Sequence, residues 1–164
     1  MKAARRHPLG RRQEQRLDEP RLDAYRDRAK RKGPAVCREC GAAYRAGRWS
    51  WQAAQPAARR TLCPACRRAR ERMPAGDVSL GGAFFREHRA EVMRRVQLCE
   101  AAEKKLHPLQ RILEVRDEAG GVRVTTTGSH LARRIGEALG KSFKGDARFR
   151  YRPGDNLLRV TWRR

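Results

Sequence analysis

The sequence is poor in acidic residues, in aromatic residues and in long apolar stretches. Its 164 residues include 18 Asp and Glu against 40 Lys and Arg, and only 6% are aromatic. No stretch approaches the roughly 20 apolar residues of a membrane-spanning helix, and no apolar segment follows the basic start as in a secretion signal. We therefore expect a cytoplasmic protein.

The sequence also lacks the motifs of common enzyme classes. It contains no phosphate-binding P-loop, no glycine-rich dinucleotide turn and no His-Glu-x-x-His, and its acidic residues are scattered. A nuclease centred on His130 is a weak alternative, because a single His without an arranged carboxylate or a second His gives little support for catalysis. We therefore expect no enzymatic activity.

Arginine is the abundant residue. The formal net charge is +22, and only seven of the 40 basic residues are Lys. The guanidinium group pairs bidentately with phosphate and stacks on bases, and a polyanionic partner relieves the self-repulsion of so basic a chain. A GC-rich genome could favour Arg over Lys, but it would not explain the excess over acids. This composition predicts a nucleic-acid partner.

Four of the five cysteines form two Cys-x-x-Cys pairs. Cys37 and Cys40 are followed, after 22 intervening residues, by Cys63 and Cys66. This spacing is typical of a structural zinc site in which four thiolates hold Zn²⁺ and leave no position open for substrate. Reduced dithiols or disulfides are the alternative, which the absence of a secretion signal disfavours. We expect structural zinc.

The pattern along the chain predicts three units. Residues 1–33 form a basic flexible arm, residues 34–73 a zinc ribbon and residues 74–164 an α+β domain, with Pro-Ala-Gly-Asp at 74–77 as the boundary. In the ribbon we expect a hairpin over 41–51 and a helix over 65–73. Trp49 and Trp51 should cover the zinc site rather than stack on bases. The ribbon helix carries three candidate nucleic-acid contacts: Arg67, Arg68 and Arg70.

The α+β domain is predicted from its periodicity. A helix over 83–106 is followed by strands at 109–116 and 122–126, a helix from about residue 129, and strands at 147–152 and 157–162. This order predicts a four-stranded, mostly antiparallel sheet with both helices on one face.

Arginines alternate with the apolar residues along these strands. Because the side-chain period of a strand is two, they share the face opposite the helices. We interpret this face as a surface that follows phosphates, with an ordinary solvated face as the alternative; it lacks the paired aromatics of an RNA-recognition-motif sheet. Its members are Arg123, Arg148, Arg150, Arg152, Arg159 and Arg163.

The turn before the second long helix is a possible phosphate-binding site. Hydroxyls, free backbone N–H groups and two following cations suit an anion, although ordinary helix capping explains Thr127 or Ser129 equally well. The residues concerned are Thr126, Thr127, Ser129 and His130, followed by Arg133 and Arg134.

Residues 36–164 resemble a set of short bacterial zinc-ribbon proteins. More distantly, they are similar to the N-terminal part of the large-ribosomal-subunit export adaptors of the nonsense-mediated-decay-three type. Those adaptors carry more cysteine pairs and further domains, so the resemblance implies contact with ribosomal RNA or the ribosomal subunit rather than export. It rests on both cysteine pairs with Gly41, Gly47, Arg48 and Trp49, on residues 107–109, on residues 125–127 and 130–136, and on Arg159, Val160 and Trp162.

These observations together predict a non-enzymatic, zinc-binding RNA-binding protein. With the resemblance, they indicate a ribosome-associated factor in assembly, quality control or stress. Two alternatives stay open from the sequence: a DNA-binding ribbon associated with transcription, and a redox switch or chaperone in which oxidation of the four cysteines ejects zinc.

Overall fold

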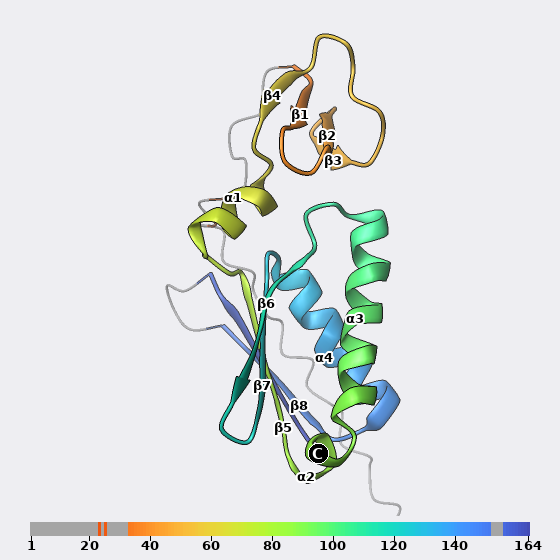
Figure 1. Ribbon diagram of the computed structural model, residues 1–164, viewed down its shortest axis with the longest axis vertical. Coiled ribbons are helices and arrows are strands. Elements are labelled where there is room, and N and C mark those ends of the chain that lie inside the picture. The colour runs from red at the N-terminus through yellow and green to blue at the C-terminus, as the bar shows by residue number, and fades with distance from the viewer. Residues whose placement is uncertain (1–22, 24, 26–32, 152–155) are drawn as a thin grey trace, which may run out of the picture.

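The computed structural model describes residues 23, 25, 33–151 and 156–164. The basic arm predicted over 1–33 therefore lies almost wholly outside the described residues, and so does Arg152. A small module containing both cysteine pairs lies at one end of the long axis, and a larger α+β domain forms the rest (Figure 1). Within the described part of the chain, no helix is long and apolar enough to cross a membrane.

The small module, which we call the ribbon, contains a four-stranded sheet of three-residue strands. The strand order is β3-β2-β1-β4, with β1 and β4 parallel and the other pairs antiparallel. The predicted hairpin corresponds to β2 and β3, and the predicted helix to α1. The elements are β1 (Ala35–Cys37), β2 (Ala43–Arg45), β3 (Arg48–Ser50), β4 (Arg59–Thr61) and α1 (Pro64–Glu71).

A tight turn joins β2 to β3. Ala46 and Gly47 have positive φ angles of 49° and 83°, as the favoured two-residue hairpin turns require. The turn places Arg45 directly opposite Arg48, so two cations flank its tip. One residue further from the turn, Tyr44 pairs with Trp49, and their rings lie 5.4 Å apart in the ribbon core.

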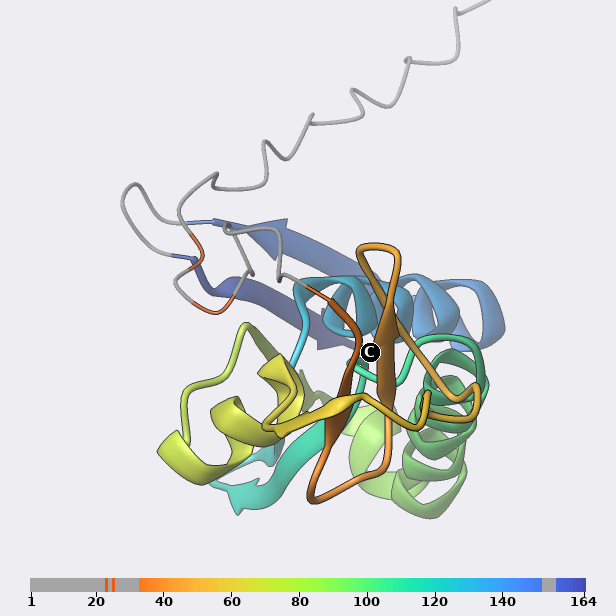
Figure 2. The same cartoon turned by 90° about the horizontal axis from the view of Figure 1, so that it is seen from above.

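The larger domain is a mixed five-stranded sheet covered on one face by helices (Figures 1 and 2). The strand order is β6-β7-β5-β9-β8, and only the β5–β9 pair is parallel. The strands are β5 (Gly76–Gly81), β6 (Ile112–Glu118), β7 (Gly121–Thr126), β8 (Asp146–Arg150) and β9 (Leu158–Arg163); the helices are α2 (Ala83–Glu87), α3 (Arg89–Leu106) and α4 (Ser129–Phe143).

The α+β class is correct, but the prediction of a single four-stranded sheet was wrong. The fifth strand, β5, begins at Gly76, within the segment interpreted as a boundary, and lies at the centre of the sheet. Glycine, Asp and Ser fill four of its six positions, and these residues have low β propensity. Close packing at the centre of the sheet outweighs this propensity. A Cβ on Gly76 would lie 2.3 Å from Thr126 Oγ1, so only glycine fits at this position of the strand.

The predicted helix over 83–106 is divided at His88, which has φ −117° and ψ 29° and separates α2 from α3.

The predicted apolar face is confirmed for β7 and β9, whose alternate residues are buried under the helices. Helix α4 approaches this face so closely that a Cβ on Gly136 would lie 2.6 Å from Val160 Cγ1. The buried residues of the two strands are Val122, Val124, Thr126, Leu158, Val160 and Trp162.

Candidate metal centre

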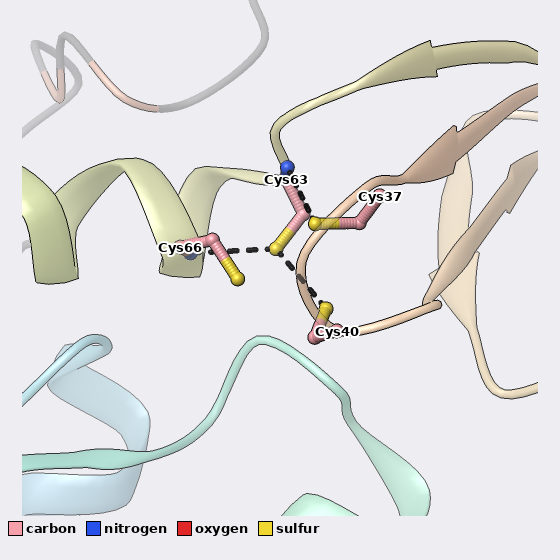
Figure 3. A group of neighbouring side chains, drawn as sticks. All are labelled: Cys37, Cys40, Cys63 and Cys66. Carbon is pink, nitrogen blue, oxygen red and sulfur yellow. Dashed lines mark hydrogen bonds between the residues drawn. The ribbon is translucent and has the colours of Figure 1, made fainter.

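The four paired cysteines meet in one cluster, as predicted. Cys37 ends β1, Cys40 lies in the following turn, Cys63 precedes α1 and Cys66 lies in its first turn (Figure 3). All four Sγ atoms lie within 4.8 Å of one another, and Cys40 Sγ is 3.7 Å from Cys63 Sγ. Tetrahedral zinc with bonds of about 2.3 Å would separate its sulfurs by about 3.8 Å. The four cysteines therefore have a geometry compatible with a metal site.

Backbone geometry brings N–H groups to the sulfurs. The N–H of Cys63 donates to Cys37 Sγ at 3.4 Å, and the N–H of Cys66 donates to Cys63 Sγ at 3.4 Å. Gly41 follows the first pair with φ 75°, the left-handed conformation that glycine adopts most easily. The second pair needs no such glycine, because Cys63 is the N-cap of α1 and the chain continues into a helix through Pro64.

The thiols differ in their readiness to ionise. Burial opposes ionisation of Cys37, but backbone N–H donors, that of Cys63 first, outweigh it and lower the pKa to about 6. Burial raises the pKa of Cys63 to about 11 and also raises the pKa of Cys66. Four neighbouring thiolates therefore require added positive charge, which a metal cation would supply.

One source of positive charge is Arg111, which the sequence analysis missed. Its Nη2 donates to Cys40 Sγ at 3.0 Å and its Nη1 to Cys66 Sγ at 3.4 Å. Burial by itself would lower the pKa of this guanidinium. Hydrogen bonds and charge interactions with these two cysteines outweigh burial, so the pKa is raised above its usual value. Nothing in the sequence marks Arg111, because it lies 71 residues from Cys40 and is one of many arginines.

Arg111 belongs to the α+β domain and is held there by hydrogen bonds from its backbone and its side chain. Its N–H donates to Thr127 Oγ1 at 2.9 Å, and its Nε donates to the carbonyl of Pro108 at 2.7 Å. Two neighbouring contacts also join the domains: Leu109 packs against the ribbon core, and Trp51 Nε1 donates to the Lys104 carbonyl at 2.6 Å. The cysteine cluster therefore lies at the junction of the two domains.

The two tryptophans have different positions. Trp49 is 7% exposed and belongs to the buried cluster that contains Cys37, Cys63 and Cys66. Trp51 is 41% exposed and lies 5.9 Å from the Arg111 guanidinium. Trp49 therefore packs in the ribbon core around the cysteines, whereas Trp51 lies on the domain junction.

The three arginines of α1 that were predicted to contact nucleic acid differ in burial and in their partners. Arg68 is buried, pairs with Asp23, lies 4.2 Å above the Tyr25 ring and donates to the Met73 carbonyl at 3.0 Å. Its guanidinium is therefore engaged within the protein. Arg70 is exposed and pairs with Glu39, and Arg67 is half-buried.

The face of the large sheet opposite the helices is less uniformly basic than expected. Arg123 forms a bidentate pair with Asp77, at 2.9 Å to Oδ1 and 2.5 Å to Oδ2, and Asp77 comes from the unpredicted central strand. Arg148 pairs with Asp146 at 2.7 Å. Of the other members, Arg150 and Arg163 are exposed and Arg159 is half-buried.

Two threonine hydroxyls of the predicted phosphate-binding turn donate hydrogen bonds within the protein. Thr126 Oγ1 donates to the Gly128 carbonyl at 2.8 Å, and Thr127 Oγ1 donates to the Leu109 carbonyl at 2.6 Å. The N–H of Leu131 donates to Gln110 Oε1 at 3.1 Å, so a side chain caps this part of α4.

The remaining residues of this turn lie at the surface. His130 Nε2 and Arg134 Nε each lie 3.1 Å from a carboxylate oxygen of Glu103. Ser129 begins α4, and Arg133 is half-buried on its first turns. Phosphate binding by this turn stays a prediction.

No family model, no curated protein and no solved structure matches this chain.

Proposed function

We propose that this protein is a non-enzymatic, ribosome-associated RNA-binding protein, an assembly, quality-control or stress factor, in which zinc occupies the four-cysteine site. Four sulfurs within 4.8 Å of one another suit Zn²⁺, and four protein ligands leave no coordination position for substrate. Zinc would thus hold the ribbon together, and Arg111 would balance part of the negative charge of the four thiolates.

The observation that carries RNA binding is the unbalanced charge of the ribbon. Residues 33–73 contain nine arginines and two acids. Both acids already have partners within the described residues: Glu39 pairs with Arg70, and Glu71 accepts a hydrogen bond from Tyr25. Two acids cannot balance nine arginines, so a phosphate chain is the partner that the remaining charge favours. Apart from Arg70, the exposed arginines of the ribbon are Arg38, Arg45, Arg48, Arg59, Arg60 and Arg72.

Ribosomal RNA is the proposed polyanion because of the resemblance to ribosomal-subunit adaptors. The direct test is sedimentation of the tagged, full-length protein on a density gradient of cell extract. We expect the protein to migrate with ribosomal particles and to be released by nuclease. Recovery only at the top of the gradient, unchanged by nuclease, would contradict ribosome association.

Binding to purified RNA tests the electrostatic mechanism. We expect log affinity to fall with log salt by about 0.7 for each phosphate neutralised on a single strand. Competition between RNA and duplex DNA at fixed salt decides between RNA and the DNA alternative. Metal analysis of the purified protein tests zinc, and gain of function on peroxide-driven zinc release would favour the redox alternative.

A further inference from the structure

A crevice runs along the junction between the ribbon and the α+β domain. It consists of two hollows of about 430 and 390 Å³. Each has the volume of a small-ligand pocket. They are parts of one crevice because they share five lining residues, which are Gly47, Trp49, Leu109, Gln110 and His130.

The smaller hollow combines positive charge with flat rings. Arg48 of the ribbon lines it together with His107 and His130 of the α+β domain, whose ring centroids lie 6.2 Å apart with planes at 82°. Glu103 orients the His130 ring through a contact of 3.1 Å to Nε2. None of the described residues that line this hollow is acidic. A planar aromatic ligand that carries negative charge fits such walls.

The hairpin turn beside the hollow adds a second observation. Arg45 and Arg48 lie directly opposite each other across Ala46 and Gly47, and like charges in this position destabilise a hairpin. Both arginines are exposed, and the acids of the ribbon have other partners. An external anion at this turn would relieve the repulsion.

The larger hollow extends the crevice toward α1. Its walls include Tyr44 and Tyr151, together with the backbone of the turn at Gly128. Asp23 also lines it, but this carboxylate is paired with Arg68. The crevice therefore offers aromatic surface along its length and cations at the hairpin end.

We propose that this crevice binds one unstacked nucleotide of an RNA strand, with the base between the His107 and His130 rings and the ribbon core, and the phosphate on Arg48 and Arg45. This inference rests on the proposed RNA-binding function and deepens it, because it gives the protein a preference for single-stranded segments. Duplex RNA, whose bases are stacked, cannot enter the hollow.

The first test uses the four histidines of the full-length, zinc-loaded protein as nuclear magnetic resonance probes. Nucleoside monophosphates are added in one arm and inorganic pyrophosphate in the other. We expect the nucleotides to shift the ring signals of His107 and His130 but not of His88, which stacks on Phe84 at 4.0 Å elsewhere in the fold. Unmoved His107 and His130 signals, or equal shifts with pyrophosphate, would overturn the proposal.

The second test measures affinity for single-stranded RNA. We expect His107→Ala to weaken binding about tenfold without changing the salt dependence, because one base–ring contact is lost and the phosphate contacts remain. Arg48→Ala should weaken binding and lower the salt slope by about 0.7. Lys105→Ala, which removes an exposed side chain near the same end of α3, is the matched control.

The outcomes separate this inference from the function on which it rests. If the wild-type protein binds RNA but His107→Ala and His130→Ala bind it equally well, the crevice proposal fails and RNA binding stands. If the wild-type protein does not bind RNA at physiological salt, the proposed function fails, and the nucleotide site fails with it.

Discussion

Replacing Arg111 by Met tests whether the α+β domain stabilises the metal centre. The change keeps an unbranched side chain but removes the donors to Cys40 Sγ at 3.0 Å and Cys66 Sγ at 3.4 Å. A hydrogen bond to a charged group contributes about 1.5 to 3 kcal/mol, and the longer contact counts for less. Because the guanidinium is only half-buried, we expect a total loss of about 2 to 3 kcal/mol. Zinc affinity should fall about 30- to 150-fold.

Competition with a chromophoric zinc chelator at fixed pH measures this loss in the full-length protein. Arg111→Lys should bind zinc with intermediate affinity, because an ammonium keeps the charge but cannot bridge two sulfurs as the guanidinium does. Arg116→Met is the matched control, since Arg116 is exposed and pairs with Glu114 rather than with the cysteines. Zinc affinity of Arg111→Met within about twofold of wild type would refute the reasoning.

Three further predictions concern the metal centre and the core. Zinc affinity should fall as pH falls, because zinc must displace protons from Cys63 and Cys66, whose pKa values are raised; calorimetry in several buffers counts the protons released, and we expect at least two near neutrality. Chelation should remove the dispersed amide signals of the ribbon and leave those of the sheet, because the two hydrophobic clusters are separate; loss of both would contradict this. Gly136→Ala should lower the free energy of unfolding by about 1 to 3 kcal/mol, because the added methyl group clashes with Val160. Gly140→Ala should raise the free energy of unfolding by up to about 1 kcal/mol, because no neighbouring atom lies within 4 Å and alanine favours the helix. Urea denaturation measures both changes.

The sequence was most informative where one short-range pattern decides the structure. The spacing of Cys37, Cys40, Cys63 and Cys66 predicted the cysteine cluster because each pair forms a local turn, and only the distance between pairs had to be bridged. Alternation along β7 and β9 likewise identified the buried face. In both cases the physical constraint repeats within a few residues.

Features that depend on tertiary contacts were missed. The sequence of β5 predicts a turn, because its Gly, Asp and Ser residues favour turns. Its position in the sheet is set by partner strands about 50 and 80 residues further along the chain. Arg111 contacts the cysteines only because the domains dock. Asp77, the acid that partners Arg123, could be assigned only once β5 was placed beside β7.

The central position of β5 has a consequence for synthesis of the protein. Its parallel neighbour, β9, supplies residues 158–163, so the middle of the sheet waits for the last strand to leave the ribosomal exit tunnel. All four cysteines have been synthesised once α1 is complete, so we expect the ribbon to bind its metal while translation continues, and Arg111 to add its contacts after the second domain has formed. Long-range pairing of this kind folds slowly and exposes apolar surface in the meantime. We therefore expect a nascent chain that matures in two stages, with metal capture preceding closure of the sheet.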